Sequence, residues 1–101
     1  MATACAPLSP GEILIKDFLK PNRLSQNALA RAIDVPTGRI NDIVRGKRGV
    51  TSDTAVRLSI YFKTTVEFWI DMQAKFDAKM AERHIRPRIE KSIRARPVSP
   101  A

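Results

Sequence analysis

Five short signals for the start of a helix divide this chain, and they constrain its fold more than any other feature. In the first, "SPGE", Ser9 suits the N-cap, Pro10 the first helical position and Glu12 the closing residue of a capping box. Further signals stand at Ser25, at Pro36, at Thr51 and at Thr64 or Thr65, where Thr64 with Glu67 matches a second capping box. Apolar residues at helical spacing follow each signal, and no segment alternates convincingly between apolar and polar residues. The sequence therefore predicts an all-α domain of five helices.

The expected helix ends come from residues that stop or distort a helix. Lys20-Pro21 ends the first helix, and Asp34 ends the second because aspartate tolerates the left-handed conformation better than most residues. Gly46 ends the third helix and Arg86-Pro87 the fifth. With 101 residues, of which 44% are apolar, the chain can build one small core. We expect a flexible N-terminus over 1–7, a domain over 8–85 with a long C-terminal helix, and a disordered basic tail over 86–101.

The second and third helices, within residues 25–45, are short and joined by a tight turn, which is typical of a helix-turn-helix unit. Ile40, Ile43 and Val44 anchor one face of the third helix, so its polar side must point outward. A formal net charge of +8 makes a polyanion a natural partner. The alternative is a solvated basic surface on a helical bundle, because runs of charge are usually just that. The turn, the caps and the apolar stripe together favour DNA binding.

In a helix-turn-helix unit the second helix lies in the major groove with its N-terminal residues toward the base edges. Arginine can bind guanine O6 and N7 together, and asparagine can pair with adenine. Side chains and backbone N–H groups at the start of the preceding helix, and cations in the loop past Gly46, suit phosphate contact. The residues expected to contact DNA are Gln26, Asn27, Thr37, Gly38, Arg39, Asn41, Asp42, Arg45, Lys47 and Arg48.

The fifth helix continues an apolar stripe beyond the length that the fourth helix can cover. Trp69 is expected in the core, because a tryptophan at helical spacing is more often core than interface. Met72, Phe76 and Met80 are expected at a dimer interface. The basic tail has three readings: a plain solvated tail, extra nonspecific affinity for DNA, or a segment that folds on an acidic or concave partner surface.

Several classes of protein are disfavoured by the residues that the sequence lacks. One cysteine, Cys5, and one histidine, His84, cannot make a metal site of the usual spacing, and no nucleophile–base pair or phosphate-binding glycine loop is present. We therefore expect no catalysis, no metal and no cofactor. No apolar run approaches the roughly 18 residues that span a bilayer, and the start of the chain lacks the features of a secretion signal. The expected location is the cytoplasm.

Three stretches together resemble the HigA-type antitoxins, a VapI-like branch of the Xre/Cro helix-turn-helix family. They are "LSPGEILIKDFL", "LSQNALARAIDVPTGRINDIVRGKRGVTSDTAVRLSIYF" and "TTVEFWIDMQAKFD", and the resemblance covers roughly residues 8–80. One departure is Asp34, where the family usually has glycine before the Val-Pro pair.

The resemblance implies a bacterial antitoxin that neutralises a small RelE-like toxin, an endoribonuclease that cuts mRNA on the ribosome. It also implies a homodimer that binds a palindrome in its own promoter, found at the nucleoid when bound to DNA. The dimer has independent support, because one unit reads only a half-site and two are needed roughly 34 Å apart. Two alternatives remain open: a free-standing Xre-type regulator without a toxin, and a protein-interaction module whose basic face only aids solubility.

Overall fold

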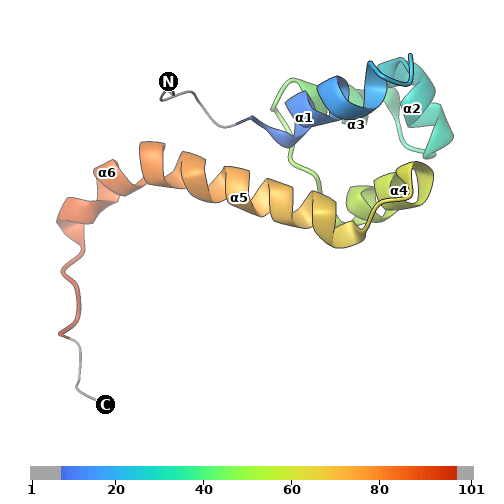
Figure 1. The fold of residues 1–101 in the computed structure, drawn as a ribbon. Helices are drawn as coiled ribbons and strands as arrows, with labels where there is room; N and C mark the ends of the chain where they lie inside the picture. The colour runs from blue at the N-terminus through green and yellow to red at the C-terminus, as the bar shows by residue number, and fades with distance from the viewer. Residues whose placement is uncertain (1–7, 98–101) are drawn as a thin grey trace, which may run out of the picture.

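The computed structural model describes residues 8–97, and all regular structure in that range is helical. The elements, which can be followed in Figure 1, are α1 (Pro10–Ile13), η1 (Leu14–Leu19), α2 (Gln26–Ala32), α3 (Thr37–Val44), α4 (Ser52–Phe62), α5 (Val66–His84), α6 (Arg86–Ile89) and η2 (Glu90–Ser92). The predicted all-α fold is confirmed, with α1 and η1 together forming the first of the five expected helices. The N-terminal segment 1–7, with Cys5, lies outside the described residues, as do residues 98–101.

Side-chain caps fix most of the helix starts. Ser9 and Glu12 form the expected capping box, in which the Ser9 N–H donates to Glu12 Oε1 at 2.8 Å and the Glu12 N–H donates to Ser9 Oγ at 3.2 Å. Ser25 Oγ accepts from the Ala28 N–H at 3.0 Å, and Thr51 Oγ1 accepts from the Thr54 N–H at 3.4 Å. These contacts satisfy backbone donors that a helix leaves unpaired in its first turn.

At two helix starts the structure refines the prediction. Pro36 is the extended residue before α3, so the helix itself begins at Thr37. Thr65, and not Thr64, caps α5, because Thr65 Oγ1 accepts from the Phe68 N–H at 3.0 Å. The Thr64 hydroxyl oxygen instead accepts from the Trp69 indole N–H at 2.7 Å, which satisfies the polar atom of a fully buried side chain.

The first helix changes from α-helical to π-helical hydrogen bonding after Ile13. Residues Leu14–Leu19 form a π-helix, in which the Lys20 N–H donates to the Ile15 carbonyl five residues earlier at 2.9 Å. Such wide turns are rare and occur frequently at functional sites. Two residues of this turn, Ile15 and Leu19, line a hollow described below.

The core lies where the first helix, α2, α3, α4 and the start of α5 meet, and we call residues 9–76 the head. Its fully buried large side chains are Leu14, Leu29, Ile40, Ile43, Leu58 and Trp69. Phe18 packs against both Phe62 and Trp69, with ring centroids 4.8 and 4.9 Å apart. The core placement of Trp69 is thus confirmed. On α2, Leu29 and Ala30 are buried, whereas Ala32 is exposed.

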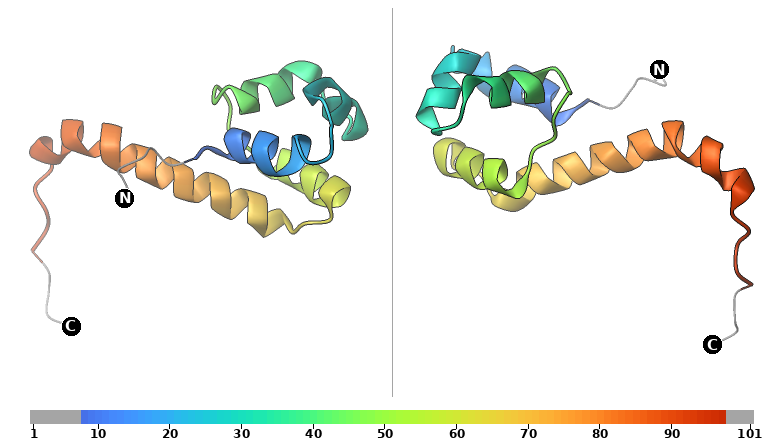
Figure 2. Two further views of the ribbon diagram at one scale, coloured as in Figure 1. Left: turned by 45° about the horizontal axis from the view of Figure 1, so that its top comes forward. Right: turned by 180° about the vertical axis from the view of Figure 1, so that it is seen from behind.

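The second half of α5 leaves the head and projects from it, as both views in Figure 2 show. We call residues 81–92 the arm. At its far end the chain bends into α6 and η2, where a disordered tail was expected; the turns of α6 are stabilised by backbone bonds such as that from the Ile89 N–H to the Ile85 carbonyl at 3.3 Å. The radius of gyration, 17.2 Å, exceeds the roughly 13 Å of a compact domain of this length because of this projection.

Candidate nucleic-acid interface

The turn between α2 and α3 depends on Asp34 and on a residue of α4. Asp34 adopts the left-handed conformation, with φ of 61°, as the sequence predicts. The Arg57 guanidinium donates to the carbonyls of Ile33 and Asp34, at 2.9 and 3.2 Å. These carbonyls lie at the C-terminus of α2 and lack partners within the helix. Arg57 therefore fixes the turn, and sequence reasoning missed it because it is 23 or 24 residues away along the chain.

The third helix has the two-sided character that groove insertion requires. Ile40 is 0% and Ile43 1% exposed, so both anchor α3 in the core. The expected contact residues lie on α3, at the start of α2 and in the loop after α3. Thr37, Gly38, Asn27, Arg45, Lys47 and Arg48 are exposed, while Gln26, Arg39, Asn41 and Asp42 are half-buried. None of these residues is in the core. Gln26, Asn27 and Asn41 line one hollow, and Lys47 and Arg48 line another beside α5.

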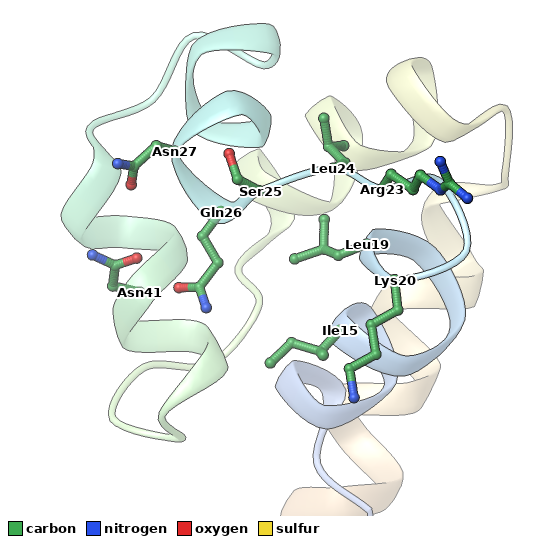
Figure 3. A pocket seen from close by; sticks show the side chains of 9 residues that line it. All are labelled: Ile15, Leu19, Lys20, Arg23, Leu24, Ser25, Gln26, Asn27 and Asn41. Atoms are coloured by element: carbon green, nitrogen blue, oxygen red, sulfur yellow. The ribbon is translucent and has the colours of Figure 1, made fainter.

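A hollow of about 560 Å³ lies between the first helix, the start of α2 and α3. Figure 3 shows the Gln26 side chain directed into this space, with Asn27 and Asn41 along the edge formed by α2 and α3. Lys20 and Arg23 belong to the lining on the opposite side, formed by the first helix and the loop after it, from which Ile15 and Leu19 point toward Gln26. These two cations were missed by sequence reasoning, although their position around Pro21, directly before α2, was the available signal.

Arg39, the first basic residue of α3, is held by an ion pair with α4. Its Nη1 lies 3.0 Å from Asp53 Oδ2, and the same oxygen lies 2.9 Å from Arg57 Nε. The Asp53 carboxylate thus joins α3, α4 and, through Arg57, the turn after α2. Because the Arg39 side chain is 28% exposed, its guanidinium is oriented by the protein and still reaches solvent.

The hydrogen bond from Arg57 is the main reason why the pKa of Asp53 lies below its ordinary value. Desolvation opposes this lowering, and the charges of Arg57 and Arg39 add to it. A depressed carboxyl pKa stabilises the fold at every pH above the ordinary value. That contribution is lost only as the pH falls through the lowered pKa. The orientation of Arg39 by Asp53 is therefore constant across the neutral range.

The loop after α3 is folded tightly against the end of that helix. Gly46 takes the left-handed conformation, with φ of +78°, and the N–H groups of Lys47 and Arg48 both donate to the Asp42 carbonyl, at 2.8 and 3.2 Å. Asp42 thus shapes the loop through its backbone. The two cationic side chains extend from a loop of defined geometry.

The residues expected at a dimer interface, Met72, Phe76 and Met80, are half-buried on α5, and Met72 packs against the core of its own chain. A second apolar surface lies on α4, where Val56 is 43% and Ile60 73% exposed. Sequence reasoning missed this surface, although the spacing of the two residues by one helical turn was visible.

Within residues 8–97 no group of histidine, cysteine, aspartate or glutamate side chains is placed to hold a metal ion. In the same range, no helix has the length and the apolar character that crossing a membrane would require.

Comparison with known proteins identifies the fold. A helix-turn-helix family model matches residues 15–69. This range includes most of η1, all of α2, α3 and α4, and the start of α5. The virulence-associated protein I of Dichelobacter nodosus is 52% identical over 75 residues, covering 74% of this chain and 69% of that protein.

Two solved structures are similar over nearly their whole length. The antitoxin GraA superimposes with a TM-score of 0.86 at 42% identity, covering 92% of this chain and 100% of that one. The Pseudomonas aeruginosa antitoxin HigA, solved with the higBA promoter, gives a TM-score of 0.81 at 41% identity, covering 87% and 96%. The sequence, the fold and the exposed polar face of α3 agree, and the chain belongs to the HigA-type antitoxins of the Xre helix-turn-helix family.

Proposed function

We propose that this chain is the antitoxin of a type II toxin–antitoxin pair and that its homodimer represses its own operon by binding a promoter palindrome. The observation that carries the DNA-binding part is the geometry of α3. Ile40 and Ile43 anchor α3 in the core, while Arg39 and Asn41 on the same helix are only half-buried. The similarity to HigA solved with promoter DNA supports the same role.

Recognition in this proposal divides between bases and phosphates. Arg39 and Asn41 face the base edges, where guanidinium and amide groups can each make paired hydrogen bonds. Gln26 and Lys20 contact the backbone on one side of α3, and Lys47 contacts it on the other. Phosphate contacts on both sides set the depth and the angle of α3 in the groove, which decides which side chains reach bases.

A palindrome requires two copies of α3 related by a two-fold axis, roughly 34 Å or a multiple of it apart. Met72, Phe76 and Met80 on α5 are our candidates for the seam between the copies. The exposed pair on α4, Val56 and Ile60, is a second apolar surface that such a seam can include.

The toxin in this proposal is a RelE-like endoribonuclease that cuts mRNA, as the membership in the HigA-type antitoxins implies. Inhibition works by complex formation, so the chain itself needs no catalytic group, metal or cofactor. The proposed location is the bacterial cytoplasm, at the nucleoid when the chain is bound to DNA.

A growth rescue tests the antitoxin role. The small open reading frame beside the gene is induced in bacteria alone and together with this chain, and the tagged chain is purified. We expect growth arrest alone, normal growth together and a stable complex of the two proteins. A harmless neighbour that does not bind this chain would contradict the antitoxin role.

A footprint on the chain's own promoter tests the regulatory role separately. We expect protection of two half-sites one or more helical turns apart. Protection without a toxic neighbour would indicate a free-standing regulator. Rescue without any protection would indicate a protein-interaction module whose basic surface has no part in DNA binding.

A further inference from the structure

The loop that carries Lys47 and Arg48 is attached to α5 as well as to α3. The Val50 N–H donates to Gln73 Oε1 at 2.7 Å, across 23 residues of sequence. Val50 itself is only 5% exposed, so its N–H has limited access to water as a substitute partner. Gln73 therefore satisfies a backbone donor directly beyond the two cations.

The Gln73 amide is fixed in its orientation. Its Nε2 donates to Asp77 Oδ1 at 2.9 Å, one turn further along α5, which directs the carbonyl end of the amide toward the loop. Gly49 lies flat against this amide, since a Cβ at Gly49 would come within 3.0 Å of Gln73 Cδ and 3.2 Å of Oε1. The loop and the helix are therefore in close contact here, and a Cβ at position 49 would displace the Gln73 side chain.

The two attachments lie on either side of Lys47 and Arg48 in the sequence. On one side the N–H groups of Lys47 and Arg48 are bonded to the Asp42 carbonyl at the end of α3. On the other side Val50 is bonded to Gln73, and a cavity of about 210 Å³ lies between the loop and α5. A loop held at both ends presents its cations in one arrangement, so less freedom is lost when they bind phosphates.

We propose that Gln73 is a positioning residue for DNA binding, which holds the loop so that Lys47 and Arg48 reach the phosphates beside α3. The proposal rests on the proposed DNA-binding function. Gln73 touches no DNA itself. Its effect passes through the backbone of Val50, and it makes the phosphate contacts depend on α5, the helix that also carries Met72 and Phe76.

The test uses Gln73→Met, which keeps the length of the side chain and removes both hydrogen bonds, with Ala78→Met as the control on an exposed position of the same helix. Binding of the full chain to a duplex with its own promoter is measured over a range of salt concentrations. Each lost phosphate contact lowers the slope of log affinity against log salt by about 0.9. We expect Gln73→Met to lower the slope by about one to two and Ala78→Met to leave it unchanged.

Testing Gln73→Met in a second variant of the protein distinguishes an effect on loop position from a general loss of stability. In the double variant Lys47→Ala/Arg48→Ala the slope is already reduced, and adding Gln73→Met is expected to change neither slope nor affinity further. An equal additional loss of affinity in that background would overturn the proposal, because Gln73 would then act on the whole domain. An unchanged slope in the single variant would also overturn it.

Hydrogen exchange in the absence of DNA tests the attachment itself. We expect the Val50 amide to exchange at least tenfold faster in Gln73→Met, with the amides of α2 unchanged. Equal exchange in both proteins would overturn the proposal. Failure of the proposed function has a different signature: the wild-type chain would then bind its own promoter no better than random DNA.

Discussion

The head and the arm both carry apolar side chains at helical spacing, yet only those of the head are buried. Trp69, in the first half of α5, is 0% exposed because the first helix and α4 cover it. Ile85 and Ile89 of the arm, four residues apart, are 44% and 45% exposed. A helical stripe gains stability only where another element removes it from water. The arm is therefore helical without a core.

The two regions also use ion pairs differently. In the head, Asp53 joins residues of α3 and α4 that are 14 positions apart. In the arm, Glu82 pairs with Arg86 within one turn, and Arg86 Nη2 donates to Glu82 Oε2 at 2.8 Å. The first pair fixes tertiary geometry, whereas the second supports one helix locally.

The largest expected contrast is in stability. Trp69→Ala removes the largest buried side chain and leaves a cavity, so the free energy of unfolding should fall by about 3–5 kcal/mol. Ile89→Ala, in the arm, should change it by less than about 0.5 kcal/mol in the monomer. Urea denaturation followed by circular dichroism measures both. Similar losses at the two positions would mean that the arm is packed in solution.

The next contrast is in DNA binding. Arg39→Ala should weaken binding to the operator by about 1–3 kcal/mol and binding to random DNA very little, because the lost contact is to a base. Arg88→Ala, an exposed cation of the arm, is the matched control and should affect both DNAs alike. Fluorescence anisotropy with the two duplexes measures the ratio. An equal loss on both DNAs for Arg39→Ala would refute base reading by this residue.

A smaller effect is expected from Asp53→Asn. The variant leaves Arg39 in place but weakens its tether, so the ratio of operator to random affinity should fall by at most about fivefold, the range of exposed ion pairs. The lowered pKa of Asp53 implies that the wild-type ratio is constant from neutral pH down to the ordinary carboxyl range. A titration of the ratio against pH checks this. A ratio that is insensitive to Asp53→Asn would show that α3 alone orients Arg39.

The smallest expected effect is local to the arm. The hydrogen bond and charge of Arg86 lower the pKa of Glu82, so this pair supports the helix above the ordinary carboxyl pKa and is lost as the pH falls through the lowered value. Arg86→Gln should raise the Glu82 pKa toward its ordinary value and leave the melting temperature of the head unchanged. Carboxyl resonances in an NMR titration report the first quantity. A shift in the melting temperature would contradict the separation of arm and head.

The sequence predicted that the helices form, where most of them begin and end, and which face of α3 points outward. Caps, prolines and apolar spacing carry this information because each acts on residues within a few positions. The sequence placed Ser9, Ser25 and Thr51 correctly as caps. It left the cap of α5 open between Thr64 and Thr65, and the structure selects Thr65 because the Thr64 hydroxyl accepts from the indole of Trp69. The sequence did not predict the short helix α6, which includes Pro87 because proline is acceptable in the first turn of a helix.

What the sequence alone determined is therefore local: five helices, a short turn at Asp34, and a basic outward face on the third helix. Tertiary structure decided how that face is held. Arg57 caps the turn from α4, Asp53 orients Arg39, and Gln73 on α5 holds the basic loop through Val50. Each of these contacts joins residues 14 to 24 positions apart. Helical periodicity fixes only which neighbours within about one turn share a face, so contacts at such separations follow from packing.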